Sequence, residues 1–241
     1  MPTDLVKARA APGVAALLYG LAAYAIFLAT FLGMVAFVQR IGVGPSLVEG
    51  RESPLGVALA VDLGLLLLLG LHHGALAHGG FERRLARVLP ATVERSTLVL
   101  ATCACLVLLM WQWRPIPSVV WDVRATAPAL VLRSLSWAGW GLVVLATFLL
   151  DHLELLGVAQ AVRGFRGREP SPGPLQAGSL ERTVRHPLYL GLFAAFWSTP
   201  SMTAGHLLVA AVGTVYILVA AWPAHPSRRS RQRSPRSNAA R

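Results

Sequence analysis

The sequence predicts an all-α fold, a multi-pass transmembrane helical bundle with four full spans and a final helical hairpin or pair of segments. Hydrophobic residues make up 55% of the 241 residues and charged residues only 14%, and the mean hydropathy is +0.57. Soluble domains carry about 25% charged residues, so this composition indicates an integral membrane protein. Several apolar runs also reach the ~20 helical residues that cross a hydrocarbon core of about 30 Å.

Four apolar runs are each long enough to form one span, and they cover residues 14–38, 55–77, 96–112 and 129–150. Lys7 and Arg9 precede the first run, as in a secretory signal. The apolar stretch is too long for a signal core, however, and no small-residue cleavage site follows it. We therefore expect the first run to stay in the mature protein as an anchor.

The last apolar region, residues 188–222, is too long for one untilted helix. It is interrupted at Pro200 and the two polar residues before it, and proline cannot continue the hydrogen-bond pattern of a helix. We therefore expect a shorter helix that ends near Trp197 and a full span over residues 205–221.

The formal net charge is +11. We do not take it as a sign of nucleic-acid binding, because the way the basic residues are distributed among the loops predicts the orientation of the protein in the membrane. Cytoplasmic loops of membrane proteins carry an excess of Lys and Arg. The first and third loops hold only Arg40, Arg51, Arg114 and Arg124. The N-terminus and the second and fourth loops hold Lys7, Arg9, Arg83, Arg84, Arg87, Arg95, Arg163, Arg166, Arg168, Arg182 and Arg185. We expect a multi-pass protein of a bacterial-type inner membrane with its N-terminus in the cytoplasm.

The sequence predicts one domain and a tail. Residues 1–222 form the expected integral membrane domain, and residues 223–241 contain no apolar side chain larger than alanine. Such a segment cannot bury enough apolar surface to fold, so we expect a disordered basic tail. The connection 151–181 is the only long cytoplasmic loop, and its Gly- and Pro-rich part, residues 164–178, is expected to be mobile, as lids are.

Tryptophan and cysteine mark two further features. Trp111, Trp113 and Trp121 flank the third loop, where aromatic side chains anchor spans at the membrane boundary. Cys103 and Cys105 lie on different faces of the third run among apolar neighbours. We expect these cysteines to be buried structural residues rather than a disulfide or a metal site.

The stretch RHPLYLG, residues 185–191, places polar groups at the mouth of a membrane segment. A proline fits the first turn of a helix, where its missing N–H has no partner to lose, so we expect Pro187 to begin a helix. Arg185 and His186 then lie at the water boundary, where a protein can hold a charged cofactor whose reactive end points into an apolar pocket. For Arg185 alone, the simpler interpretation is the basic flank of a span.

Ionisable groups inside spans are costly and usually face a cavity or a partner. Four groups qualify: His72 and His73 with His78, Asp151 and His152 with Glu154, Arg182 and Arg185 with His186 and Tyr189, and His206 alone. By the expected topology the first three reach the cytoplasmic side, whereas His206 does not. Their convergence predicts a shared site. For each histidine alone, solvation at the boundary or a hydrogen bond to a loop explains the residue equally well.

A metal site built from His73, Asp151 and His152 is a weaker alternative. No single helix offers the i, i+4 ligand pair of an H-E-x-x-H motif. Adjacent His72 and His73 point in different directions on a helix, so only one of them can face a shared pocket. We expect no metal ion.

Five ordered segments resemble a known family. They are LYGLAAYAIFLATF at 18–31, ERSTLVL at 94–100, WQWRPIPSVVWDV at 111–123, ATFLLDHLELLGV at 146–158 and VRHPLYLGLFAAFWSTPSMTAGHLL at 184–208. Together they are similar to the methanethiol S-methyltransferase family, which belongs with NnrU-like proteins and isoprenylcysteine carboxyl methyltransferases. The resemblance runs from about residue 18 to about residue 220.

The resemblance implies an enzyme that methylates a small thiol, methanethiol to dimethyl sulfide, with S-adenosylmethionine as cofactor at a cytoplasm-facing site. In the wider superfamily the RHPxYxG element lies against the cofactor. This implies cofactor binding by Arg185, His186, Pro187, Tyr189 and Gly191, with Arg182 in the same cluster. Gly191 would permit close backbone approach.

Methyl transfer to a thiol needs a base, because the thiolate is a far better nucleophile than the thiol. Histidine titrates in a range that suits this step. We expect His152 to be the base, helped by Asp151, with His73 as the second candidate. A pocket at membrane depth also suits a small apolar thiol.

The chain departs from the family pattern at three places. The second run ends in His72, His73 and Gly74 where the family usually has Gln-His-Ser, and the fourth ends in Asp151 and His152 where the family usually has Asn-His. After about Ala220 the family continues with an acidic Glu-Glu element and a Tyr-containing segment, whereas a tail rich in Arg, Ser, Pro and Ala follows here. This composition is typical of an out-of-frame reading of a GC-rich gene, so we expect that a frameshift replaced the family's C-terminus.

Two other functions stay open. The same fold and cofactor could serve another acceptor, such as an isoprenylated cysteine or a lipid amine, although the short loops favour a small one. A non-catalytic NnrU-like membrane protein, or a transporter, would need no methyl donor. The sequence shows no inverted repeat and no mid-membrane charge apart from Asp62 and Arg133, which argues against transport.

The expected partners are a small thiol and the lipid bilayer, not nucleic acid; the oligomeric state is not predicted.

Overall fold

The computed structural model describes residues 13–42, 45–77, 87–149, 153, 156–166 and 180–221. The described helices are α1 (Gly13–Gln39), α2 (Leu55–Ala77), α4 (Glu94–Gln112), α5 (Thr126–Leu149), α7 (Val158–Phe165), α8 (Leu180–Trp197) and α9 (Ala204–Ala221). Two short strands, β1 (Val119–Asp122) and β2 (Ser201–Thr203), lie between helices. In α8, side chains are described from His186 onward.

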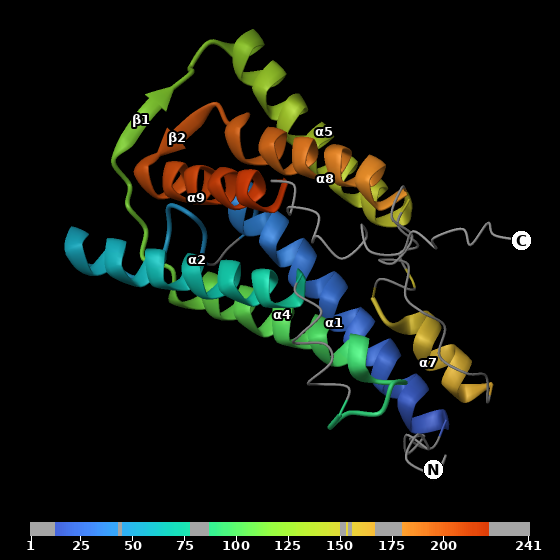
Figure 1. Ribbon diagram of the computed structural model, residues 1–241. Coiled ribbons are helices and arrows are strands. Elements are labelled where there is room, and N and C mark those ends of the chain that lie inside the picture. The colour runs from blue at the N-terminus through green and yellow to red at the C-terminus, as the bar shows by residue number, and fades with distance from the viewer. Residues whose placement is uncertain are drawn as a thin grey trace, which may run out of the picture.

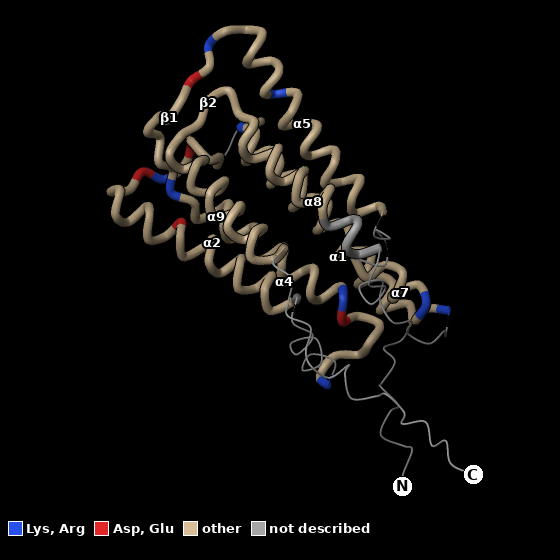
Figure 2. Tube along the Cα trace, turned by 45° about the horizontal axis from the view of Figure 1, so that its top comes forward, with Lys and Arg blue, Asp and Glu red and all other residues tan. Residues whose placement is uncertain are grey.

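Five of these helices, α1, α2, α4, α5 and α9, are long and apolar enough to cross a membrane. Each lies within a few residues of a predicted run, so the multi-pass helical bundle is confirmed. Figure 2 shows the charged positions of the described helices gathered toward the two ends of the bundle, with a long uncharged belt between them. We call the end that carries β1 and β2 the strand end, and the opposite end, where α2 finishes, the histidine end.

The last apolar region forms two helices, as expected from the break at Pro200. Helix α8 ends at Trp197, and α9 begins at Ala204, one residue before the predicted position. Helix α8 runs beside α5 along the bundle, and α9 lies between α8 and α2 (Figure 1). The final pair of helices therefore turns at the strand end and returns to the histidine end.

Helices α5 and α8 pack closely because small residues line their interface. A Cβ added to Gly139 would lie 2.6 Å from the backbone nitrogen of Ala195 and 2.6 Å from the carbonyl oxygen of Gly191. The hydroxyl of Ser136 donates to the carbonyl of Ala195 at 2.8 Å. Close backbone approach and hydrogen bonds between helices are what holds helices together in lipid, where apolar burial alone gives little.

Strands β1 and β2 join the α4–α5 connection to the α8–α9 connection. They pair antiparallel, with Val119 opposite Thr203, Trp121 opposite Met202 and Asp122 opposite Ser201, and the indole of Trp121 donates to the Thr199 carbonyl at 3.0 Å. These strands are not predicted from the sequence, because four and three residues are too few to show an alternating pattern. Backbone groups close to the hydrocarbon need partners, and the pairing supplies them.

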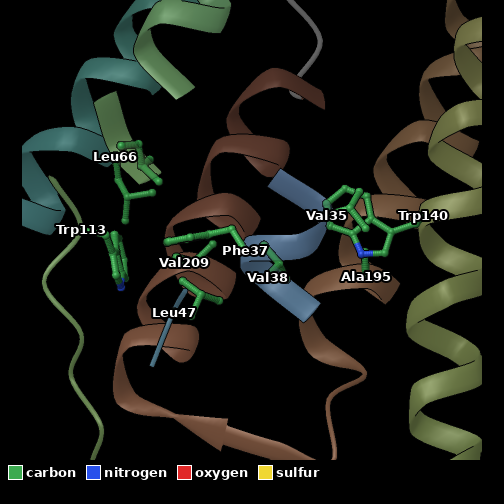
Figure 3. Close-up of a cluster of buried hydrophobic side chains, with 10 residues drawn as sticks. Val35, Phe37, Val38, Leu47, Leu66, Trp113, Trp140, Ala195 and Val209 are labelled. Carbon is green, nitrogen blue, oxygen red and sulfur yellow. The ribbon is translucent and has the colours of Figure 1, made fainter. Parts of the chain in front are cut away.

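Aromatic side chains connect the central helices of the bundle (Figure 3). The ring of Trp140 on α5 meets Phe31 of α1 and Phe196 of α8 edge-on, and both pairs of centroids lie 5.9 Å apart. Edge-to-face contacts of this kind stabilise a pair by about 0.5–1.5 kcal/mol beyond the area that the rings bury. One indole therefore links α1, α5 and α8.

Trp113 corrects one expectation. It is only 2% exposed, and its ring meets Phe37 edge-on with centroids 6.0 Å apart. Figure 3 shows it facing Phe37, Leu47 and Val209. The expected role as a boundary anchor is wrong for Trp113, because the chain turns its ring inward just after α4 ends. Trp111, at 71% exposed, does face outward.

Asp62 has a structural role inside α2. The side chain is fully buried, and its Oδ1 accepts the backbone N–H of Arg114 at 2.9 Å. Arg114 lies just beyond the end of α4, and its backbone N–H bonds to Asp62 on α2 rather than within α4. A buried carboxylate that accepts this bond ties α2 to α4 and gives one of the two mid-span charges a structural explanation.

The long connection after α5 contains a helix that sequence reasoning missed. Helix α7 packs along α1 (Figure 1), and a Cβ added to Gly20 of α1 would lie 2.7 Å from the Cβ of Ala161. Val158 and Ala161 are buried, whereas Phe165 is half exposed. The helix is too short to give a clear periodic signal. Residues 167–179 and the tail 223–241 lie outside the described residues, so their predicted mobility stays a prediction.

Gly157 is required at the start of α7. Its φ is +84°, a conformation that favours glycine, and an added Cβ would lie 2.7 Å from the Oγ and 2.8 Å from the backbone nitrogen of Ser96. We expect Gly157→Ala to lower the free energy of unfolding by about 1–3 kcal/mol, measured by thermal unfolding in detergent. Gly64→Ala on α2 is the control, since nothing lies within 4 Å of its added Cβ. Equal losses for both variants would contradict this account.

Candidate functional site

Two adjacent histidines occupy the end of α2 and point to different neighbours. The Nε2 of His72 lies 2.9 Å from the Thr102 hydroxyl, and that hydroxyl donates to the Leu98 carbonyl at 3.1 Å. The hydroxyl therefore accepts a hydrogen bond from the Nε2–H of His72, which ties this ring to α4. The rings of His72 and His73 stand nearly perpendicular, at 88°, so the expected divergence of the pair is observed.

His73 faces α9 with one nitrogen available. Its Nδ1 lies 3.1 Å from the Leu69 carbonyl, and because a carbonyl only accepts, Nδ1 carries the hydrogen. In the neutral ring Nε2 then holds a lone pair. The ring meets Tyr216 of α9 edge-on, with centroids 6.1 Å apart. His73 is thus half-buried, fixed in one tautomer and oriented toward the last helix.

Tyr216 is a site residue that sequence reasoning missed. Besides its contact with His73, it lies on α9, which packs against α8, the helix that carries Tyr189. A Cβ added to Gly70 would reach 3.7 Å from the Tyr216 ring, so this glycine leaves room for it on α2. The signal was available: the topology that brings His73 and Tyr189 to one depth places this tyrosine, near the end of the last span, beside them.

Helix α8 begins earlier than the motif predicted. It starts at Leu180, and Pro187 lies inside it rather than in its first turn. The helix extends through the segment before the proline, and the missing N–H costs the bond to the carbonyl of Thr183 four residues back. Prolines inside membrane helices are tolerated where neighbours satisfy the freed carbonyl. The expectation that Pro187 begins the helix is therefore wrong.

The remaining motif residues separate into two faces of α8. His186 is exposed and Tyr189 is half-buried, while Arg182 and Arg185 lie in the helix with side chains outside the description. Gly191 is buried, and an added Cβ would lie 2.8 Å from the carbonyl of Gly139. The close backbone approach expected at Gly191 is therefore made by α5.

Asp151 and His152 lie outside the described residues, between the end of α5 and α7, so their placement is not tested. Among the residues that the structure describes, His73 and Tyr216 are in contact, and Tyr189 lies on α8, which packs against the helix that carries Tyr216. No three potential metal ligands gather within the same described part of the chain.

His206 lies apart from this group, as expected. It starts α9 at the strand end and is 1% exposed. Its Nε2 donates to the Phe196 carbonyl at 2.9 Å, which links α9 to α8. Two open hollows of about 380 and 400 Å³ also lie at the strand end, on either side of Arg40. They are remote from His73, so they belong to a different part of the molecule.

The comparisons with known proteins give a consistent family. The chain is 43% identical over 204 residues to a methanethiol S-methyltransferase of Mycobacterium tuberculosis, covering 85% of this chain and 84% of that protein. It is 44% identical over 207 residues to methanethiol S-methyltransferase 2 of Bradyrhizobium diazoefficiens, covering 86% and 80%. Nurim of Danio rerio is 30% identical over 180 residues, covering 70% and 64%.

No family model matches the chain, and no solved structure matches it. The family assignment rests on the curated relatives, whose similarity covers most of both chains. The protein belongs to the methanethiol S-methyltransferase family.

Proposed function

We propose that the protein transfers a methyl group from S-adenosylmethionine to methanethiol, giving dimethyl sulfide, at a site formed by the ends of α2, α8 and α9. The observation that carries the proposal is the state of His73. Its Nδ1–H is held by the Leu69 carbonyl, so in the neutral ring Nε2 carries the lone pair, and the ring lies against Tyr216 of α9. The names of the relatives supply the reaction.

His73 acts as the base in this proposal. Its Nε2 accepts the proton of the thiol, and the sulfur that keeps the electron pair forms the new bond to the methyl carbon as the methyl–sulfonium bond breaks. When bound, S-adenosylmethionine would supply an activated methyl group, with its sulfonium sulfur as the leaving group that becomes a neutral thioether. The proton on His73 then passes to water. The sequence favoured His152 as base, but the geometry of the described residues supports His73, with Asp151 and His152 proposed as neighbours across the site.

The residues at the histidine end fit a sulfonium cofactor by their chemistry. The aromatic rings of Tyr189 and Tyr216 suit a cationic sulfur, which is attracted to π faces as other onium groups are. Arg182 and Arg185 lie in the first two turns of α8, where basic side chains and a helix N-terminus suit a carboxylate. His186 and Pro187 complete the proposed cofactor wall. Gly191 contributes indirectly, because its contact with α5 sets the position of α8.

The proposed orientation places the histidine end in the cytoplasm of a bacterial-type cell, in its inner membrane. The start of α1 lies at this end, as do Arg87, Arg95, Arg163 and Arg166 among the described basic residues (Figure 2), in accordance with the excess of basic residues on the cytoplasmic side. A polar cofactor made in the cytoplasm could then reach the site directly, while a small apolar thiol could arrive through the bilayer.

The reaction can be tested in isolated membranes. Membranes that contain the folded protein are supplied with S-adenosylmethionine carrying a labelled methyl group, with and without methanethiol, and labelled dimethyl sulfide is measured in the headspace. Membranes without the protein are the control. Product that depends on both substrates supports the proposal, and the absence of product above the control would overturn it. A prenylated cysteine offered in place of methanethiol separates the two acceptor classes.

Tyr216 is expected to position His73 through its ring. Tyr216→Ala removes the edge-on contact, which is worth about 0.5–1.5 kcal/mol for such pairs, so we expect a fall in turnover of up to about tenfold. Tyr216→Phe keeps the ring and should retain most of the activity. Both variants are compared by kcat and KM for methanethiol. A loss of equal size in both variants would show that the hydroxyl, and not the ring contact, is what matters.

A further inference from the structure

The strand end contains a polar hollow that the proposed reaction does not use. It encloses about 400 Å³ between the end of α1, the first turns of α5 and the segment that joins α8 to β2. Gln39, Arg40, Arg133, Ser136, Trp137 and Thr199 are among its lining residues. The lining includes two arginines and no acidic residue, so the hollow has a net positive charge.

Arg40 is held in an unusual conformation at this hollow. It follows the last residue of α1 with a φ of +58°, at the position where helices usually end in glycine. An Nη2 hydrogen bond of 2.9 Å to the Ser201 carbonyl fixes its guanidinium, and burial lowers the pKa of this group. A strained, partly buried arginine that still faces two hollows indicates that the side chain is needed there.

Arg133 is the second cation. It is the eighth residue of α5, about 10 Å along the helix from its start, and its side chain is exposed. Neither Arg133 nor Arg40 has an ion-pair partner among the residues that the structure describes. A charge at this depth in a span is costly unless it meets a partner or water. The two arginines thus offer several unused N–H donors to an anion.

The surroundings favour a lipid over a free anion. Trp137 lies one turn deeper than Arg133 on α5, lines the same hollow and is 49% exposed. Leu130 and Leu135, also on α5, are exposed as well. A phospholipid presents an anionic phosphate near the boundary and apolar chains below it, which is the same order as Arg133 and Trp137 along the helix.

We propose that this hollow binds the phosphate of an anionic phospholipid from the leaflet at the strand end. Arg40 and Arg133 donate to the phosphate oxygens, and the acyl chains lie along Trp137. The lipid fills the space between α1 and α5 and neutralises the arginines. The proposal does not depend on the methyl-transfer reaction, because no residue of the hollow belongs to the histidine end.

The test measures lipid retention directly. The full-length protein is purified in detergent, incubated with phosphatidylglycerol or phosphatidylcholine, and examined by native mass spectrometry. We expect preferential retention of phosphatidylglycerol and about tenfold weaker retention in Arg133→Gln, since the variant loses a charge-assisted hydrogen bond to the phosphate. Arg124→Gln is the matched control, because Arg124 lies at the same end but pairs with Asp122 at 2.9 Å. It should bind lipid as the unchanged protein does.

Further measurements distinguish a lipid bound in this hollow from a free anion and from lipid bound elsewhere. Arg133→Lys keeps the charge and should retain more lipid than Arg133→Gln, and thermal unfolding without lipid checks that each variant is folded. Glycerol 3-phosphate, which lacks acyl chains, should not displace the lipid at equal concentration. Displacement by glycerol 3-phosphate would mean that the hollow binds a free anion, and unchanged retention in the Arg40→Gln, Arg133→Gln double variant would mean that the lipid binds elsewhere. Either result overturns the proposal.

Discussion

Replacing His73 by asparagine is expected to reduce the rate of methyl transfer by about 10²–10⁴-fold, the usual contribution of a general base. The asparagine amide can take the place of Nδ1–H and donate to the Leu69 carbonyl, which accepts at 3.1 Å. The variant therefore keeps the local hydrogen bond and loses only the basic nitrogen. Initial rates of dimethyl sulfide formation in membranes, at matched protein levels, measure the effect.

His72→Gln is the matched control for this variant. The glutamine amide can replace the Nε2–H that now meets Thr102 at 2.9 Å, so the tie to α4 is kept. We expect a change of less than about fivefold, because His72 does not face the site; this is well below the loss expected for removal of a base. If His73→Asn keeps its rate while His152→Asn loses it, the base is His152, as the sequence alone suggested.

Among the substitutions considered, Gly139→Ala, which adds a methyl group to the tight interface between α5 and α8, is expected to lower stability the most. The Cβ of Gly139→Ala would lie 2.6 Å from two backbone atoms of α8, and backbone atoms cannot move aside as a flexible side chain can. We expect the free energy of unfolding to fall by about 3 kcal/mol, the upper part of the range for overpacking. Displacement of α8 would also move Tyr189, so methyl transfer should fall as well. Thermal unfolding in detergent and the headspace assay measure the two effects.

Gly141→Ala separates packing from helix propensity. It lies on the same helix, and nothing is within 4 Å of its added Cβ, so its stability should match that of the unchanged protein or exceed it slightly. Equal destabilisation of the Gly139 and Gly141 variants would contradict the packing explanation and point to a general intolerance of α5 to substitution.

The long apolar runs of the sequence made most of the fold predictable. The runs now seen as α1, α2, α4 and α5 needed only length and apolarity, and the break at Pro200 needed only the chemistry of proline. The same reasoning failed at Pro187, because a proline at the end of a motif does not reveal whether the residues before it continue the helix. It also failed for Trp113, since a residue just beyond a span can turn outward or inward, and only the packing of other helices decides which.

The sequence predicted at which depth in the membrane the candidate site lies, but not which side chains face it. Topology placed His73 and Tyr189 at one end of the bundle, but which of two adjacent histidines faces the site depends on the rotation of α2, and that is set by its contacts with α4 and α9. Tyr216 shows the same limit. Topology places this tyrosine at the depth of His73, but whether its ring faces His73 depends on the rotation of α9.

The pairing of α5 with α8 also bears on how the protein is made. Helix α8 carries Glu181, Arg182 and Arg185 in its first two turns, and it is not among the described helices that are long and apolar enough to cross a membrane. Helix α5 is synthesised earlier and presents Gly139 and Ser136 as a ready surface for it. The surface that stabilises α8 in the bilayer is therefore already in place when this less apolar helix is made.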